Sequence, residues 1–227
     1  MVKHLNFPDL ESAKKVRDEY FTKYHSTAKA LTVAEEEGKF PTPSSPQEGP
    51  LFDPKDLATF WASQLNFELL GKPDQKLIDM LKDCPLQLVA FSNGPRKYVQ
   101  RVLVELGLNE IFTDDKLFAV DDVLPHCKPE KAAFDIVLEK VNAKADECIM
   151  VEDSMKNIRA AKALGMKTIL VAGKGRQSNN NLDSATKAAE ATKIGDAPDT
   201  SDIAVDVCVE VCSQIRDALP HLWEQKN

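Results

Sequence analysis

The sequence has few cysteines and no long apolar segment, and these two absences exclude several classes of protein. Its 227 residues include 5 cysteines without a CxxC pair, at Cys84, Cys127, Cys148, Cys208 and Cys212. This spacing argues against a zinc site and a disulfide framework, so we expect buried, reduced thiols. No run approaches the ~20 apolar residues of a membrane span, and the N-terminus lacks a signal-peptide core. We therefore expect a cytoplasmic protein with no membrane partner.

An excess of positive charge is also missing. The formal net charge is −7 and the sequence pI is about 5.2, which argues against nucleic acid or an anionic membrane as partner. An acidic protein can still bind a phosphorylated small molecule if a metal ion and a local lysine provide the positive charge. With 43% hydrophobic and 29% charged residues, the composition is that of an ordinary globular protein.

Strand patterns are absent from the first 82 residues. Helical spacing predicts helices over 7–25, 53–67 and 73–82, and a loop composition covers 38–50. After residue 85 the pattern changes, and short apolar runs alternate with helical patterns. The runs predict strands over 86–91, 117–120, 148–151, 167–172 and 204–209.

Alternating strands and helices indicate βαβ units and a mainly parallel sheet covered on both faces. We therefore predict an α/β fold with a doubly wound, Rossmann-like sheet. The predicted organisation is a helical N-terminal domain over 1–75 and an α/β core over 76–227. Within the core, the low-complexity composition of 173–202 predicts a surface insertion.

Two motifs follow strand ends and suit a phosphate. Ser92 and Asn93 follow the run at 86–91, and the Ser92 hydroxyl and nearby backbone amides can donate hydrogen bonds to phosphate oxygens. Lys128, at the start of a helical pattern, can neutralise a phosphoryl group. In an open parallel sheet, ligands bind beyond the carboxyl ends of the strands, where we expect these residues to meet. The alternatives are a plain strand-to-helix turn and a solvated lysine.

A third motif suits a divalent cation. Glu152 and Asp153 end the apolar run at 148–151, and adjacent acids at a buried strand end carry a desolvation cost unless a partner offsets it. Their hard oxygens are suited to Mg²⁺. Ser154 is a good helix N-cap, with Asn157 three residues later. The alternative assigns Asp153 to helix capping.

These motifs and their order resemble the haloacid dehalogenase (HAD) superfamily of aspartate-nucleophile phosphatases, subfamily IA. Ser92 looks like the second motif of that family, Lys128 like the third, and Glu152-Asp153 like the fourth, with Asn157 as the polar residue that usually follows. The resemblance extends over nearly the whole chain and is closest to the pyrimidine 5′-nucleotidases of fungi and plants. The strings at 91–93, 127–129, 151–158 and 219–224 have close counterparts there, and 20–31 and 53–70 resemble the small helical cap.

The chain departs from the family at its first motif. Members begin with an apolar strand ending in Asp-x-Asp, whose first aspartate attacks phosphorus and whose second acts as acid and base. Here no strand before residue 86 ends in this way, and Asp114-Asp115, Asp121-Asp122 and Asp206 do not replace it. The family places that strand in the centre of the sheet, so the strands ending at 91 and 152 should each keep one unpaired edge. A longer native chain is the expected source of this strand, with strand exchange between subunits as an alternative.

The resemblance implies a phosphatase that hydrolyses small phosphomonoesters, with nucleoside monophosphates as the leading substrates and Mg²⁺ as cofactor. Ser92, Asn93 and Lys128 would hold the phosphate, and Asp153, helped by Glu152, would hold the metal. Without its Asp-x-Asp, this chain should be inactive as given. One alternative is a non-catalytic protein that binds a phosphorylated ligand or another protein. A lesser one is a dehalogenase, which the acidic pair at 152–153 disfavours. The sequence leaves the oligomeric state open.

Overall fold

The computed structural model describes residues 1–2, 4–42, 50–173 and 197–224. Most of the insertion predicted at 173–202 therefore lies outside the described residues. The chain forms two compact units, which are described separately below. The first contains Met1–Pro73 and Leu88–Lys128, and the second contains Asp74–Gln87 and Pro129–Asn227. The boundary near residue 75 between a cap and a core stays a prediction.

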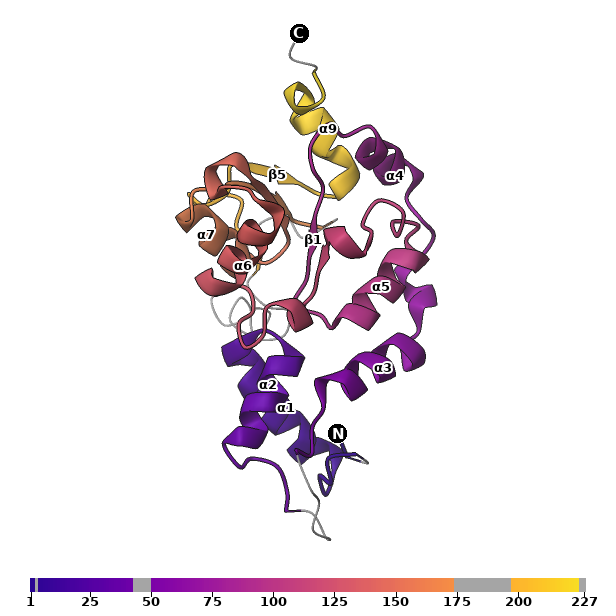
Figure 1. Ribbon diagram of the computed structural model, residues 1–227, viewed down its shortest axis with the longest axis vertical. Coiled ribbons are helices and arrows are strands. Elements are labelled where there is room, and N and C mark those ends of the chain that lie inside the picture. The colour runs from indigo at the N-terminus through magenta and orange to yellow at the C-terminus, as the bar shows by residue number, and fades with distance from the viewer. Residues whose placement is uncertain (3, 43–49, 174–196, 225–227) are drawn as a thin grey trace, which may run out of the picture. The chain divides into compact units, whose positions relative to one another are not determined.

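The helices of the first unit follow local capping signals. The bounds are α1 (Leu10–Tyr24), α2 (Thr27–Glu36), α3 (Pro54–Gln64), the 3₁₀ segment η1 (Phe67–Leu70) and α5 (Arg96–Glu105). Asp9 begins α1 by accepting a hydrogen bond from the Ser12 backbone N–H at 2.7 Å. His25 ends it in the left-handed region with a φ of 51°. The chain then returns as α2, which packs along α1 (Figure 1).

Two differences from the predicted helices have local causes. The sequence analysis did not assign a separate helix at 27–36, where α2 lies. The helix predicted over 53–67 ends at Gln64, because Leu65 adopts an extended backbone with a ψ of 148°. Asn66 then starts η1 by accepting a hydrogen bond from the Glu68 N–H at 3.0 Å.

The sheet of the first unit is small. Strand β1 (Ala90–Phe91) runs parallel to β2 (Leu117–Phe118), with Ala90 opposite Leu117 and Phe91 opposite Phe118. Two 3₁₀ segments flank β2, namely η2 (Asp114–Lys116) and η3 (Val120–Asp122). The strand prediction was wrong for 86–89, because β2 provides partners for only two residues and a strand requires a ladder of hydrogen bonds.

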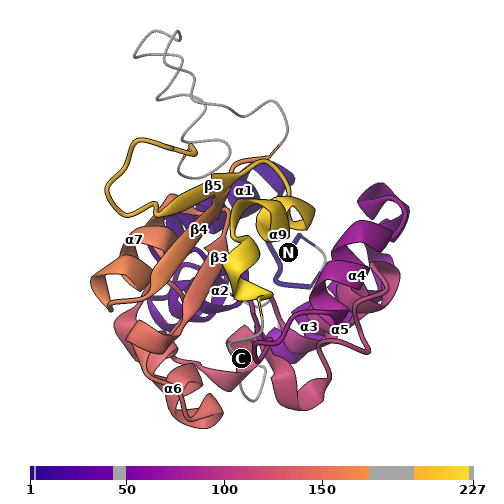
Figure 2. The ribbon, with the colours of Figure 1, turned by 90° about the horizontal axis from the view of Figure 1, so that it is seen from above.

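The second unit contains a three-stranded parallel sheet in the order β3-β4-β5 (Figure 2). Successive residues of β4 point to opposite faces, and each face has its own apolar core. Leu170 packs with Met155 and Ile158, whereas Ile169 packs with Met80 and Val209. The elements in chain order are α4 (Gln75–Lys82), α6 (Lys131–Val141), η4 (Ala145–Glu147), β3 (Ile149–Glu152), α7 (Met155–Ala163), β4 (Lys167–Val171), β5 (Val207–Val209), η5 (Cys212–Gln214), α9 (Ile215–Ala218) and η6 (Pro220–Leu222).

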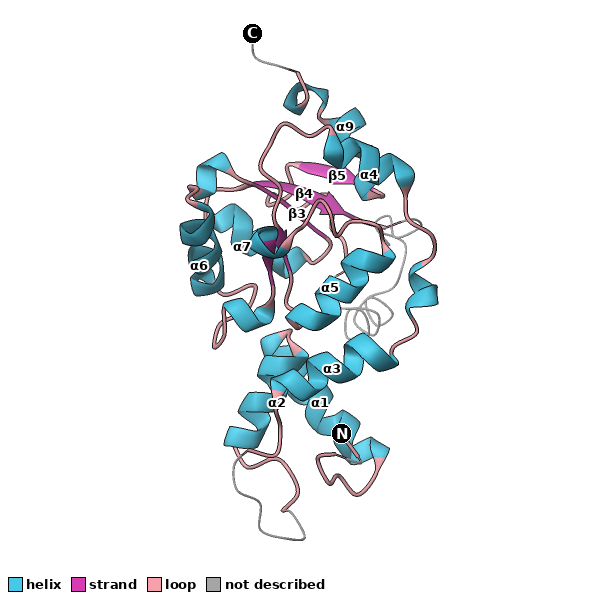
Figure 3. Cartoon of the chain, turned by 45° about the vertical axis from the view of Figure 1, so that its right-hand side comes forward, coloured by secondary structure: helices cyan, strands magenta, loops and turns pink. Residues whose placement is uncertain are grey.

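This arrangement confirms the predicted α/β class with parallel strands. It also agrees with the prediction about strand edges, since β1 pairs only with β2 and β3 only with β4 among the described residues. Figure 3 shows β3, β4 and β5 in magenta. The middle side chains of β3, which has one strand partner, are more exposed than those of β4, which has two. Val151 of β3 is 40% exposed, whereas Leu170 of the central strand β4 is 0% exposed.

The cysteines differ from the prediction of buried thiols. All five are free, but only Cys127 is buried, and Cys208 is exposed. A four-residue β3 and a three-residue β5 bury little of what lies beside them. In the part of the chain that the structure describes, no helix combines the length and the apolar character needed to cross a membrane.

Candidate functional site

Ser92 and Gly94 form a tight turn directly after β1. The Ser92 N–H donates to the Phe118 carbonyl at 2.9 Å, which extends the pairing of β1 with β2 by one hydrogen bond. The Ser92 hydroxyl accepts from the Gly94 N–H at 3.0 Å. A Cβ on Gly94 would lie 3.2 Å from both Ser92 Oγ and Tyr98 Cδ1, closer than ordinary contact. The turn therefore favours glycine at this position, and the hydroxyl stays at the strand end.

Asn93 joins this turn to Lys128, which lies 35 residues away in the sequence. Its Nδ2 donates to the Lys128 carbonyl at 2.7 Å, and its Oδ1 accepts from the Lys128 N–H at 2.9 Å. The Asn93 carbonyl in turn accepts from the Ser26 hydroxyl at 3.2 Å. The amide thus pairs with the backbone of Lys128 as a neighbouring strand would.

Lys128 is buried, with 5% of its surface exposed. Its Nζ donates to the Phe91 carbonyl at 2.7 Å and lies 4.9 Å from the centroid of the Phe91 ring. A carbonyl oxygen and a ring face both favour a cation. The alternative of a solvated lysine is therefore wrong. The ammonium is held against the last residue of β1.

The acidic pair lies in the second unit, at the end of β3. Glu152 Oε1 accepts from the N–H groups of Asp153 and Ser154 at 3.2 and 3.4 Å, so the glutamate stabilises the turn into α7. Ser154 occupies the N-cap position of α7, which means that Asp153 is not the capping residue. Asn157 is buried in the first turn of α7, with 8% of its surface exposed.

The charge of Asp153 has an effect on a neighbouring thiol. Burial raises the pKa of Cys212, and the nearby carboxylates of Asp153 and Asp74 raise it further.

Hard carboxylate oxygens at a strand end fit Mg²⁺, which commonly takes one or two carboxylates and completes its shell with water and phosphate. Groups of three or more His, Cys, Asp or Glu side chains that could hold a metal are absent from the described residues. The donor set therefore fits a lightly coordinated Mg²⁺ rather than an all-protein metal cage.

Sequence reasoning missed an ionic network that holds the turn after β1. Arg96 donates through Nη2 to Asp122 Oδ2 and to the Leu117 carbonyl, both at 2.7 Å. Its backbone N–H donates to Asp121 Oδ2 at 2.7 Å, so a distant aspartate caps α5. The available signal was the pair of adjacent acids at 121–122, which the sequence pattern relates only to the missing nucleophile. The structure gives them this supporting role.

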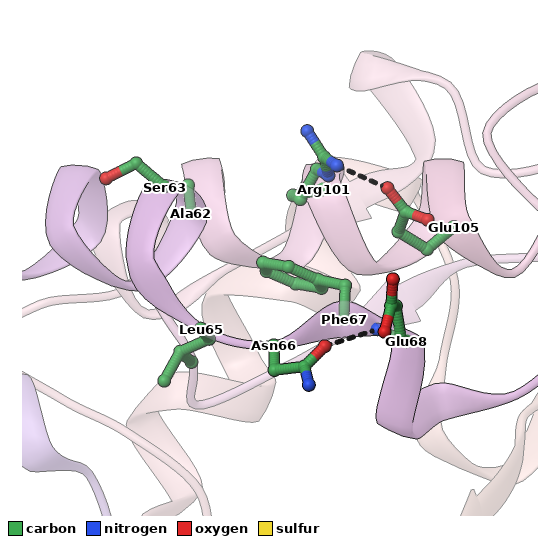
Figure 4. A pocket seen from close by; sticks show the side chains of 8 residues that line it. All are labelled: Ala62, Ser63, Leu65, Asn66, Phe67, Glu68, Arg101 and Glu105. Carbon is green, nitrogen blue, oxygen red and sulfur yellow. Dashed lines mark hydrogen bonds and ion pairs between the residues drawn. The ribbon is translucent and has the colours of Figure 1, made fainter.

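A cavity in the first unit is lined by residues other than the motif residues. It measures about 500 Å³ and is open to the surface (Figure 4). In it, Arg101 forms an ion pair with Glu105 at 2.5 Å, and its guanidinium carbon lies 5.3 Å from the Phe67 ring centroid. Its lining residues are Ala62, Ser63, Leu65, Asn66, Phe67, Glu68, Arg101 and Glu105.

The structure thus brings together Ser92, Asn93 and Lys128 in one unit, and Glu152, Asp153 and Asn157 in the other. A family model described as haloacid dehalogenase-like hydrolase matches residues 15–165, which is more than half of the chain. The chain belongs to this family. All six predicted site residues lie within the matched range.

The chain is similar to curated proteins that have two different names. A phosphoglycolate phosphatase of Colwellia psychrerythraea is 30% identical over 89 residues, which cover 39% of this chain and 38% of the relative. A CBBY-like protein of Arabidopsis thaliana is 30% identical over 124 residues, which cover 55% of this chain and 38% of the relative. The matched segment spans less than two fifths of either relative.

Solved structures confirm the HAD fold. L-2-haloacid dehalogenase from Xanthobacter autotrophicus aligns with a TM-score of 0.56 at 20% identity, covering 92% of this chain and 82% of that chain. CbbY from Rhodobacter sphaeroides, solved in complex with phosphate, aligns with a TM-score of 0.53 at 15% identity, covering 92% and 81%. At these identities the likeness concerns the fold alone.

Proposed function

We propose that the first unit of this chain holds the phosphate, and that its second unit holds the Mg²⁺, of a phosphatase for small phosphorylated metabolites. One observation carries the proposal. The Lys128 ammonium is buried and fixed 2.7 Å from the carbonyl of Phe91, next in sequence to the Ser92 hydroxyl. A buried cation beside a hydroxyl donor is suited to a multiply charged anion.

In this proposal each residue has one role. Lys128 neutralises phosphate charge, and the hydroxyl of Ser92 donates a hydrogen bond to a phosphate oxygen. Asp153, with Glu152 shaping its turn, holds Mg²⁺, and Asn157 supports the start of α7. When bound, Mg²⁺ polarises a phosphoryl oxygen as a Lewis acid. The nucleophile and the acid/base of the family have no counterpart at a strand end before residue 86, so we propose that these 227 residues bind without turnover.

The substrate class rests on two kinds of support. The curated relatives include proteins named phosphoglycolate phosphatase, which favours a small phosphomonoester. The strings at 91–93, 127–129, 151–158 and 219–224 favour the nucleotidase branch, and hence a nucleoside monophosphate. Both classes present the same phosphate group to Lys128.

The second candidate is a protein that binds a phosphorylated ligand or a protein partner without catalysing a reaction. Two observations together favour this candidate. The Lys128 ammonium is held by the Phe91 carbonyl, and no strand before residue 86 ends in Asp-x-Asp. A dehalogenase is the lesser candidate, although several solved neighbours carry that name. The acidic pair at 152–153 disfavours it, because paired carboxylates suit a cation.

A titration with inorganic phosphate in the presence of Mg²⁺ tests the proposal. We expect binding in the millimolar range, on the order of −4 kcal/mol, and about tenfold weaker but still measurable binding in Lys128→Met. Lys97→Met is the matched control, because Lys97 is exposed on α5, where its Nζ donates to the Thr59 hydroxyl at 3.3 Å. Equal phosphate affinity in the Lys128→Met variant and the unaltered chain would rule out this site.

A further inference from the structure

The side-chain amide of Asn93 forms hydrogen bonds with backbone groups through both its nitrogen and its oxygen. A neutral amide offers two N–H donors and one carbonyl acceptor. The two donors point to the carbonyls of Lys128 and His25, at 2.7 and 3.4 Å, and the carbonyl accepts the Lys128 N–H at 2.9 Å. In this arrangement neither amide hydrogen remains for a phosphate.

Lys128 lies outside regular secondary structure and depends on such contacts. It falls between η3 and α6, where no strand ladder or helix serves its backbone. Buried backbone groups require partners, and the Asn93 amide provides one for the N–H and one for the carbonyl. With the backbone held at that point, the Nζ reaches the Phe91 carbonyl.

We infer that Asn93 is a positioning residue for Lys128 and acts on a bound phosphate only through that ammonium. This inference rests on the proposed function and assigns the side chain of Asn93 to Lys128 rather than to the phosphate. A lysine has a long flexible stem, so a fixed backbone lowers the entropy cost of placing its charge. The hydroxyl of Ser26 donates to the backbone carbonyl of Asn93 and not through the side-chain contacts given above, so a variant at Ser26 tests the backbone end of the residue.

The first experiment measures the rate at which an acetylating reagent modifies Lys128, by mass spectrometry. Asn93→Ala should raise this rate about tenfold, because loss of both amide contacts favours local opening by about 1.4 kcal/mol. Asn93→Asp keeps the size of the side chain but sets an oxygen against the Lys128 carbonyl, and it should raise the rate as well. Ser26→Ala is the matched control and should leave the rate unchanged.

Acetylation of exposed Lys131 is the internal reference for reagent activity, since its rate should not change. Circular dichroism reports whether each variant remains folded. If Asn93→Ala unfolds, the isosteric Asn93→Asp variant provides the answer. An unchanged Lys128 rate in folded Asn93→Asp would overturn the inference. So would a rate in Ser26→Ala as high as in the Asn93 variants.

The second experiment is a double-mutant cycle on phosphate binding. Asn93→Ala should weaken inorganic phosphate binding about tenfold in the unaltered chain and have no further effect in Lys128→Met. Further weakening in the Lys128→Met background would show that Asn93 touches phosphate itself and would overturn the inference. If the unaltered chain does not bind phosphate, the proposed function is wrong, and so is the predicted effect of Asn93→Ala on phosphate binding. The acetylation rates would still decide whether Asn93 positions Lys128.

Discussion

Asp206 shows how one carboxylate connects the strand starts of the second unit. Its Oδ2 accepts from the Thr168 N–H at 2.9 Å, and its other oxygen pairs with Lys162. Thr168 is 0% exposed, and its hydroxyl donates to the Ala204 carbonyl at 2.5 Å. The carboxylate therefore holds β4 in place just before β5 begins.

The pKa of Asp206 sets the direction of its pH dependence. The hydrogen bond with Lys162 lowers this pKa most, and the Thr168 bonds lower it further. The folded state thus releases the proton more readily than the unfolded chain. The stabilisation is complete above the ordinary aspartate pKa of about 3.9 and is lost as the pH falls through the lower folded value.

We therefore expect Asp206→Asn to lower the free energy of unfolding at pH 7 by about 1 kcal/mol, and by less at pH 3. Urea denaturation at the two pH values measures the difference. Asp217→Asn, at an exposed position of α9, is the control and should change neither value. An equal loss at both pH values would contradict the role given to the Asp206 charge.

At the scale of elements, the two edges of the three-stranded sheet differ from its centre. Strand β4 has partners on both sides, whereas β3 has β4 alone among the described residues. In a strand the N–H groups point alternately to the two sides, so alternate amides of β3 face away from β4. These amides should be the least protected part of the sheet.

We expect hydrogen exchange at alternate β3 amides to be at least about tenfold faster than at β4 amides. Residue-resolved exchange by NMR measures both strands in the same sample, so β4 serves as the internal control. Uniform protection along β3 would show that another backbone segment covers this edge. It would also contradict the open edge that the sequence predicts.

At the scale of the whole molecule, binding and turnover can be separated. With Mg²⁺, the 227 residues should release no phosphate above background from phosphoglycolate, a nucleoside monophosphate or an aryl phosphate. Covalent catalysis and acid/base catalysis together account for many powers of ten in rate, and both need the aspartates of the Asp-x-Asp strand. A colorimetric phosphate assay makes the measurement, and an intact family phosphatase serves as the positive control. Turnover that disappears in Asp121→Asn would reveal a nucleophile elsewhere in the chain.

The sequence by itself determined the α/β class, the order of most helices and strands, and the positions of the motif residues at strand ends. These features depend on short-range patterns, such as the helical spacing over 73–82 or the apolar run at 148–151 that ends in Glu152. Tertiary structure decided the separate helix α2 and the two-residue length of β1. It also decided the contact of Asn93 with Lys128. Some of these features depend on a partner distant in the sequence, and others depend on a local backbone state that several residue types can adopt. Patterns of nearby side chains specify neither the distant partner nor the backbone state.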